Sequence, residues 1–126
     1  MYQLAISRDF IARHYLIGGD WGVENLEHSH HYRAEVTITG AALDRHGYLL
    51  DIVALEQALQ DIIGGYAERV LNEQPPFAGL NPSIEHFARI LWEQLRERVS
   101  LPGQQITVRL WENNRDWAAY SADRPD

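Results

Sequence analysis

Cysteine is absent from the 126-residue chain. Disulfide bonds, thiolate nucleophiles and cysteine-bound metal sites are therefore excluded, and any metal ion must be held by His, Asp or Glu side chains. Basic residues are also scarce: 11 Lys and Arg stand against 18 Asp and Glu, for a formal charge of −7, and they form no cluster. Because phosphate groups are bound by clustered cations, we expect no nucleic-acid partner, and a heavily phosphorylated substrate is disfavoured.

Long apolar runs are missing as well. No run approaches the roughly 18 residues that span a bilayer, and residues 1–10 lack the basic start and apolar stretch of a secretory signal. We therefore expect a cytoplasmic protein with no membrane partner. The length and the 45% hydrophobic content predict a single globular domain over residues 1–126.

Alternation of polar and apolar residues predicts four strands. In the first, His14 shares its parity with the apolar residues from Leu4 to Ala12, which places its side chain on the same face as theirs. The predicted strands cover residues 2–14, 28–39, 106–111 and 117–120.

Two helices are predicted between the second and third strands, because apolar residues recur there every three or four positions. The first has Asp51 as its cap and an apolar stripe from Ile52 to Val70. The second opens at Asn81-Pro82, a cap followed by proline at the first helical position, and carries a stripe from Ile84 to Val99. The order ββααββ predicts an α+β domain, with the helices packed on one face of an antiparallel four-stranded sheet. The open edges of such a sheet favour symmetric self-assembly.

The most informative local feature is the pair of histidines in His28-Ser29-His30. Side chains two residues apart in a strand project from the same face, roughly 7 Å apart, so both imidazoles can converge on one ion. A hairpin-like return over residues 15–27 would bring His14 beside them as a third ligand. Three neutral imidazoles leave a fourth position open, which is typical of a catalytic zinc site. The alternative is that these histidines form a solvated turn.

Three carboxylates could belong to such a site. Glu24 and Glu27 lie in the loop before the histidine pair, and either could serve as a general base beside a metal, or both could simply be hydrated. Glu112 follows the third strand and could accept hydrogen bonds from a ligand that carries paired N–H groups, or it could be a surface charge. The other histidines are expected to be structural or solvent-facing (His31) or at the surface (His46 and His86).

These motifs resemble the family of 6-pyruvoyl-tetrahydropterin synthase and 6-carboxytetrahydropterin synthase. Phe10-x-Ala12-x-His14 is similar to the family's F-x-A-x-H segment, and His28-Ser29-His30-His31-Tyr32 to its H-G-H-N-Y segment. Further similar segments follow in order along the chain: Tyr48-Leu49-Leu50-Asp51, Leu71-Asn72-Glu73, Pro76-Phe77, Asn81-Pro82-Ser83-x-Glu85, Val108-x-x-x-Glu112 and Tyr120.

The resemblance implies a tunnelling fold, in which sheets from several subunits form a barrel, commonly as a trimer-based hexamer with sites between subunits. It implies that Zn²⁺ is held by His14, His28 and His30. It also implies a pterin substrate whose amino and N–H edge donates hydrogen bonds to Glu112.

Two departures from the family pattern concern proton transfer. Glu24 stands where the family has a cysteine, four residues before the histidine pair, and Ala67-Glu68 stand where it has an Asp-His pair. The elimination of triphosphate that defines the standard synthase needs such groups, so we do not expect that reaction. A branch of the family with Glu for Cys is linked to folate-type pterin synthesis.

The resemblance therefore implies a zinc-dependent lyase that cleaves the side chain of 7,8-dihydroneopterin or its triphosphate. Glu24 would be the base, with Glu68 a second candidate for proton transfer. The alternatives are a synthase that forms 6-carboxytetrahydropterin for queuosine synthesis, a zinc- and pterin-binding homologue without the standard synthase activity, and a structural protein.

Overall fold

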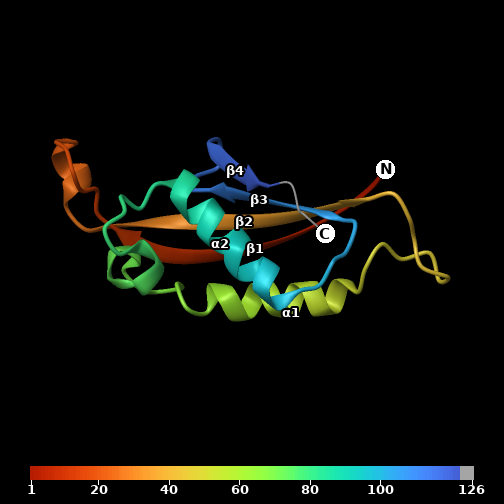
Figure 1. The fold of residues 1–126 in the computed structure, drawn as a ribbon. Coiled ribbons are helices and arrows are strands. Elements are labelled where there is room, and N and C mark those ends of the chain that lie inside the picture. The colour runs from red at the N-terminus through yellow and green to blue at the C-terminus, as the bar shows by residue number, and fades with distance from the viewer. Residues whose placement is uncertain (123–126) are drawn as a thin grey trace.

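The four predicted strands form one antiparallel sheet with the order β1-β2-β3-β4. The computed structural model describes residues 1–122. Both helices lie on the same face of the sheet (Figure 1), so the predicted α+β class and the order ββααββ are confirmed. Three short 3₁₀ helices, η1 to η3, complete the element list: β1 (Tyr2–His14), η1 (Gly22–Asn25), β2 (His28–Gly40), α1 (Ile52–Ile63), η2 (Leu71–Glu73), η3 (Pro75–Phe77), α2 (Ile84–Arg98), β3 (Gln105–Trp111) and β4 (Trp117–Ser121).

The core lies between the sheet and the helices. Along β1, alternate residues are buried, and this alternation continues to His14 at the end of the strand. Phe10 and Tyr32 are paired across β1 and β2, and their rings stack at 5.4 Å with Phe87 of α2 edge-on to both. Each fully buried large side chain contributes about 1.5–3 kcal/mol, so this aromatic cluster firmly joins α2 to the end of the sheet that carries His14.

The first helix is shorter than its apolar stripe predicts. Its cap is confirmed, because the Asp51 carboxylate accepts hydrogen bonds from the backbone N–H groups of the helix's first turn. The helix ends at Ile63, and the predicted continuation to Val70 is wrong. Gly64-Gly65 follows, and glycine lowers helix stability by about 1 kcal/mol per residue. Tyr66 and Val70 are still buried, Tyr66 from a turn and Val70 from an isolated β-bridge with Arg13 of β1.

The second helix begins later than predicted. Its cap is Ser83, whose hydroxyl accepts a hydrogen bond from the backbone N–H of His86, so the predicted start at Asn81-Pro82 is wrong. Asn81 is used differently: its side-chain oxygen accepts from the backbone N–H of Ile17 at 3.0 Å. A residue engaged by a distant loop is not free to cap its own helix.

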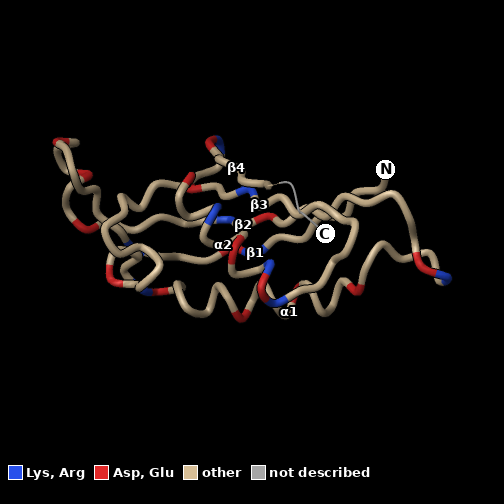
Figure 2. Tube along the Cα trace, viewed as in Figure 1, with Lys and Arg blue, Asp and Glu red and all other residues tan. Residues whose placement is uncertain are grey.

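Charged residues are spread over strands, helices and connections, with acidic and basic positions interspersed (Figure 2). The connection over residues 15–27 differs, because it contains Asp20, Glu24 and Glu27 but no Lys or Arg. Within residues 1–122, no helix is long and apolar enough to cross a membrane.

Candidate metal centre

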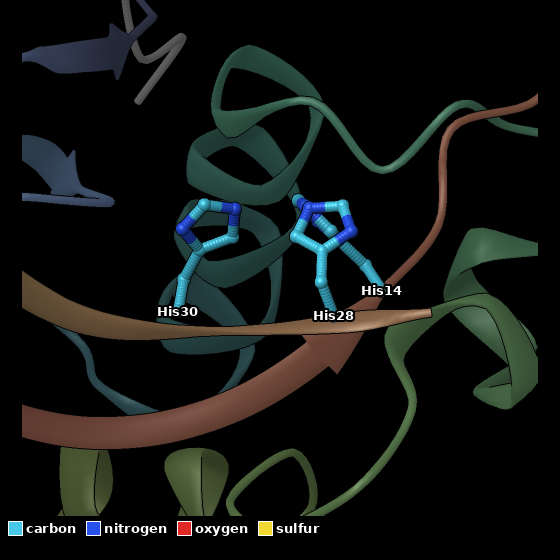
Figure 3. A group of neighbouring side chains, drawn as sticks. All are labelled: His14, His28 and His30. Carbon is cyan, nitrogen blue, oxygen red and sulfur yellow. The ribbon is translucent and has the colours of Figure 1, made fainter. Parts of the chain in front are cut away.

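The three predicted ligand histidines lie together at one end of the sheet (Figure 3). The antiparallel register of β1 and β2 pairs His14 with His28, and Ala12 with His30. The three ring centroids are 4.6, 4.8 and 5.0 Å apart, and one nitrogen from each ring lies within 4.8 Å of the others. The triad could therefore hold a metal ion, and the predicted return of residues 15–27 is confirmed.

Two asparagine side chains direct the chain as it leaves β1. The amide of Asn72 forms two hydrogen bonds with the backbone of Tyr15, donating to its carbonyl at 2.9 Å and accepting from its N–H at 3.0 Å. Asn81 accepts from Ile17. These contacts substitute for the strand pairing that ends at His14. The sequence placed both asparagines in motifs, but it gave no sign of which backbone groups they bind.

The imidazole of His28 is oriented by a backbone carbonyl. Its Nδ1 lies 2.7 Å from the carbonyl oxygen of Leu26, which can only accept, so Nδ1 carries the proton and Nε2 has a free lone pair in the neutral ring. That Nε2 lies 3.0 Å from Nε2 of His14. A backbone carbonyl on the far nitrogen is a usual partner of a metal-binding histidine.

His14 is held by Tyr32, a residue that sequence analysis did not assign to the site. The Tyr32 hydroxyl lies 3.1 Å from Nδ1 of His14, and a hydroxyl can accept the Nδ1 proton, which leaves Nε2 free for a metal. The buried aromatic two residues after His30 was the available signal. Burial and the charge of Glu112 raise the pKa of Tyr32 well above its usual value, so this hydroxyl stays protonated.

Burial also keeps His14 uncharged. This residue is only 2% exposed. Desolvation, with smaller contributions from His30 and His28, lowers the pKa of His14 to about 4, although a hydrogen bond with the backbone of Pro82 opposes the shift. The ring is therefore neutral near pH 7, and the neutral ring is the form that binds metal.

Of the two loop glutamates, only Glu24 contacts the triad among the described ion pairs. It lies in η1, and its Oε2 is 3.1 Å from Nε2 of His28, with a side chain 52% exposed. Glu27 instead lies 3.7 Å from the guanidinium of Arg13, which projects from the opposite face of β1 to His14. The geometry therefore separates two carboxylates that the sequence left equivalent.

Glu112 lies on the same face of the sheet as the triad. The register pairs Arg33 with Trp111, so the next residue, Glu112, is opposite Tyr32 and close enough for its charge to raise the pKa of that tyrosine. Its residue is half-buried. This carboxylate is thus a neighbour of the site and not an isolated surface charge.

Glu68 is not brought to the triad within this chain. Its residue is exposed, with a left-handed backbone at φ 62°. Its backbone N–H donates to the carbonyl of Ile11 at 2.7 Å, and its own carbonyl accepts from the Arg13 guanidinium. These contacts place it beside the outward-facing residues of β1.

The remaining histidines lie outside the triad. His31 is exposed and lies 3.9 Å from Asp9 on the other face of the sheet, as expected, and His46 is exposed in its predicted turn. His86 was predicted to be a surface residue, and this is wrong. It is half-buried, and its Nδ1 lies 2.7 Å from the backbone carbonyl of Asn81, so it stabilises the start of α2.

Comparison with known proteins places these features in a family context. A family model described as 6-pyruvoyl tetrahydropterin synthase matches residues 3–123. A 6-pyruvoyl tetrahydrobiopterin synthase of Drosophila melanogaster is 25% identical over 100 residues, which cover 78% of this chain and 60% of that protein. The match thus spans less than two thirds of the length of this relative.

Solved structures show the same fold. The 6-pyruvoyl tetrahydropterin synthase of Caenorhabditis elegans superposes with a TM-score of 0.83 at 20% identity, over 97% of this chain and 96% of that one. The Plasmodium vivax enzyme superposes with a TM-score of 0.80 at 14% identity, over 98% of both chains. A variant of that enzyme, in which alanine replaces a catalytic glutamate, superposes with a TM-score of 0.79 at 15% identity, over 98% of both chains.

Proposed function

Because the chain belongs to the 6-pyruvoyl tetrahydropterin synthase family, we propose that it is a zinc-dependent lyase that cleaves the side chain of a pterin. The proposed substrate is 7,8-dihydroneopterin or its triphosphate. The observation that carries this proposal is the carboxylate oxygen of Glu24, 3.1 Å from Nε2 of His28. It puts a proton acceptor beside the histidine triad, at the position where the chain differs from the family's cysteine.

The donor set at the triad fits zinc. Three imidazoles with no cysteine are a known ligand set for catalytic zinc, and the hydrogen bonds to Nδ1 of His28 and His14 leave their Nε2 atoms facing each other. When bound, zinc would supply a Lewis acid next to the hydroxyl groups of the substrate. His14, His28 and His30 would hold it.

Glu24 is the proposed base of a retro-aldol cleavage. Its carboxylate takes the proton of the 2′-hydroxyl, the bond between C1′ and C2′ breaks, and C2′ becomes the aldehyde carbon of glycolaldehyde. The electron pair of the broken bond passes into the pterin ring system, and C1′ gains a proton that balances the one removed. The other product is 6-hydroxymethyl-dihydropterin. In the Plasmodium vivax relative a glutamate is a catalytic residue, which supports this role for a glutamate.

Glu112 is the proposed anchor of the pterin ring. Its carboxylate lies on the triad's face of the sheet, opposite Tyr32, and a carboxylate accepts two parallel hydrogen bonds from a planar donor pair. The amino and ring N–H edge of a pterin is such a pair. This contact would direct the side chain of the substrate toward Glu24 and the triad.

We further propose that the chain works as a homo-oligomer, a trimer or hexamer, with sites between subunits. The sheet has two edge strands, β1 and β4, and an open edge favours pairing with another chain. Glu68, which does not reach the triad of its own chain, could take part in proton transfer only at a site on a neighbouring subunit.

The test is incubation of the zinc-loaded protein with dihydroneopterin and, separately, with its triphosphate, followed by identification of the products. Release of 6-hydroxymethyl-dihydropterin from either substrate supports the proposal. Formation of a 6-carboxytetrahydropterin would instead favour the alternative synthase. Tight pterin binding without any product would identify a zinc- and pterin-binding homologue.

A further inference from the structure

Two electron-pair donors face each other across 3.1 Å at the edge of the triad. One is Nε2 of His28, whose other nitrogen donates its proton to the carbonyl of Leu26. The other is Oε2 of Glu24, and an ionised carboxylate can only accept. Two acceptors at this distance repel each other unless a positive charge lies between them. A metal ion bound by both atoms would supply that charge.

The spacing around Nε2 of His28 matches that of ligands around one ion. Zinc bonds of about 2.0–2.1 Å in a tetrahedron place neighbouring ligand atoms roughly 3.3 Å apart. Nε2 of His28 lies 3.0 Å from Nε2 of His14 and 3.1 Å from Oε2 of Glu24. Both separations are within a few tenths of an ångström of this value, so His28 has a ligand-like neighbour on each side.

The loop fixes Glu24 in this place. The carbonyl of Glu24 accepts a hydrogen bond from the N–H of Leu16, and its own N–H donates to the carbonyl of Trp21. The next side chain, Asn25, bonds the backbone of Leu16, Gly19 and Trp21. Residues 15–27 offer no Lys or Arg to neutralise the carboxylate, and among the described ion pairs its partner is His28.

From these contacts we propose that Glu24 is the fourth ligand of the resting metal site, and that it leaves this position when a pterin binds. Departure frees the carboxylate to act as the base, so this second part rests on the proposed function, whereas the ligand role does not. In the substrate-free protein Glu24 would occupy the fourth coordination position and keep water out of it, and its carboxylate would be available for proton transfer only in the complex with a pterin.

Metal binding without substrate tests the ligand role. The zinc-free protein and its Glu24→Ala and Glu24→Gln variants are titrated with Zn²⁺ against a competing chelator, and with Co²⁺ while the visible absorption is recorded. The control is Glu27→Gln, a loop glutamate that pairs with Arg13 and not with the triad. We expect the Zn²⁺ affinity of both Glu24 variants to fall by at least about tenfold, because loss of a residue that only supports a ligand already lowers metal affinity about 10–100-fold. The Co²⁺ absorption bands should also change, because a ligand of the metal has been removed. The control should match the unmodified protein.

The outcomes separate the two proposals. Unchanged Zn²⁺ affinity and Co²⁺ bands in both Glu24 variants would show that Glu24 contacts His28 without binding the metal, and would overturn the ligand role. Altered metal binding with no pterin turnover in the unmodified protein would support the ligand role and reject the proposed function. Circular dichroism of each variant confirms that it is folded, as is expected for changes at an exposed side chain.

Discussion

Nε2 of His14 and Nε2 of His28 lie 3.0 Å apart, although 14 positions separate the two residues in the sequence. The pairing of β1 with β2 places them directly opposite each other. Each ring has a hydrogen-bond partner on its other nitrogen, the hydroxyl of Tyr32 for His14 and the carbonyl of Leu26 for His28. The site is thus preorganised for a cation by the strand register and by two fixed ring orientations.

The triad should determine metal affinity and metal-dependent stability. Replacing His30 by Ala removes one of three ligands, so we expect Zn²⁺ affinity to fall at least about 100-fold. The unmodified protein at a free Zn²⁺ concentration 100 times its dissociation constant should gain about 2.7 kcal/mol of unfolding free energy, and the variant at that concentration should gain much less. Thermal unfolding with and without Zn²⁺ measures both. His31→Ala, on the opposite face of the same strand, is the control and should keep the full metal effect.

The stability of the zinc-free protein should depend on pH through His14. Its pKa is about 4 in the folded chain against 6.5 for an unperturbed histidine. Between these values the unfolded state binds more protons, so the free energy of unfolding rises with pH. We expect a loss of about 3 kcal/mol as the pH falls from 6.5 to 4. Urea unfolding at several pH values tests this, and a curve for His14→Asn with the same slope as the unmodified protein would contradict it.

Tyr32→Phe should weaken metal binding while leaving the core packed. The change removes the hydroxyl beside His14 but keeps the ring that stacks on Phe10. We expect Zn²⁺ affinity to fall about 10–100-fold and the unfolding free energy to fall by about 1 kcal/mol. Tyr66→Phe is the matched control, because its hydroxyl bonds Gln94 and not a histidine of the triad. It should lower stability similarly without affecting Zn²⁺ affinity.

Glu112→Gln should impair pterin binding but not metal binding. A hydrogen bond to a charged group contributes about 1.5–3 kcal/mol, so we expect pterin affinity to fall at least about tenfold, measured by calorimetry or by pterin fluorescence. The control is Glu35→Gln on the outer face of β2, where Glu35 lies 3.8 Å from Arg109. Equal pterin affinity in the Glu112 variant and the unmodified protein would reject the anchor role.

Glu24→Gln should slow cleavage of the pterin side chain. A positioned general base contributes about 10²–10⁴ in rate, so we expect kcat to fall by about that factor in protein saturated with Zn²⁺. Product formation by Glu27→Gln should stay near that of the unmodified protein. A Glu24→Gln variant that cleaves as fast as the unmodified protein would remove this residue from the mechanism.

The predicted end of a strand or helix was correct where a local sequence pattern sets it, and wrong where contacts with distant residues set it. The strand that ends at His14 was predicted to the residue, because alternation is local and continues to its last position. The helix predicted to reach Val70 ends at Ile63. Periodicity could not reveal this end, because Tyr66 is buried from a turn and Val70 from a bridge to Arg13. The predicted cap at Asn81 was wrong because its amide is engaged by Ile17, 64 residues away.

The sequence by itself determined that His28 and His30 share one face of their strand and that His14 lies on the apolar face of its own strand, since parity along a strand follows from backbone geometry alone. Only the tertiary structure decided which carboxylate joins them. Glu24, Glu27 and Glu68 are alike in residue type, yet only Glu24 contacts His28 among the described ion pairs. That choice depends on how the loop over residues 15–27 folds. The first residues of this loop are hydrogen-bonded by the side-chain amides of Asn72 and Asn81, which come from distant parts of the chain. No local pattern encodes such contacts.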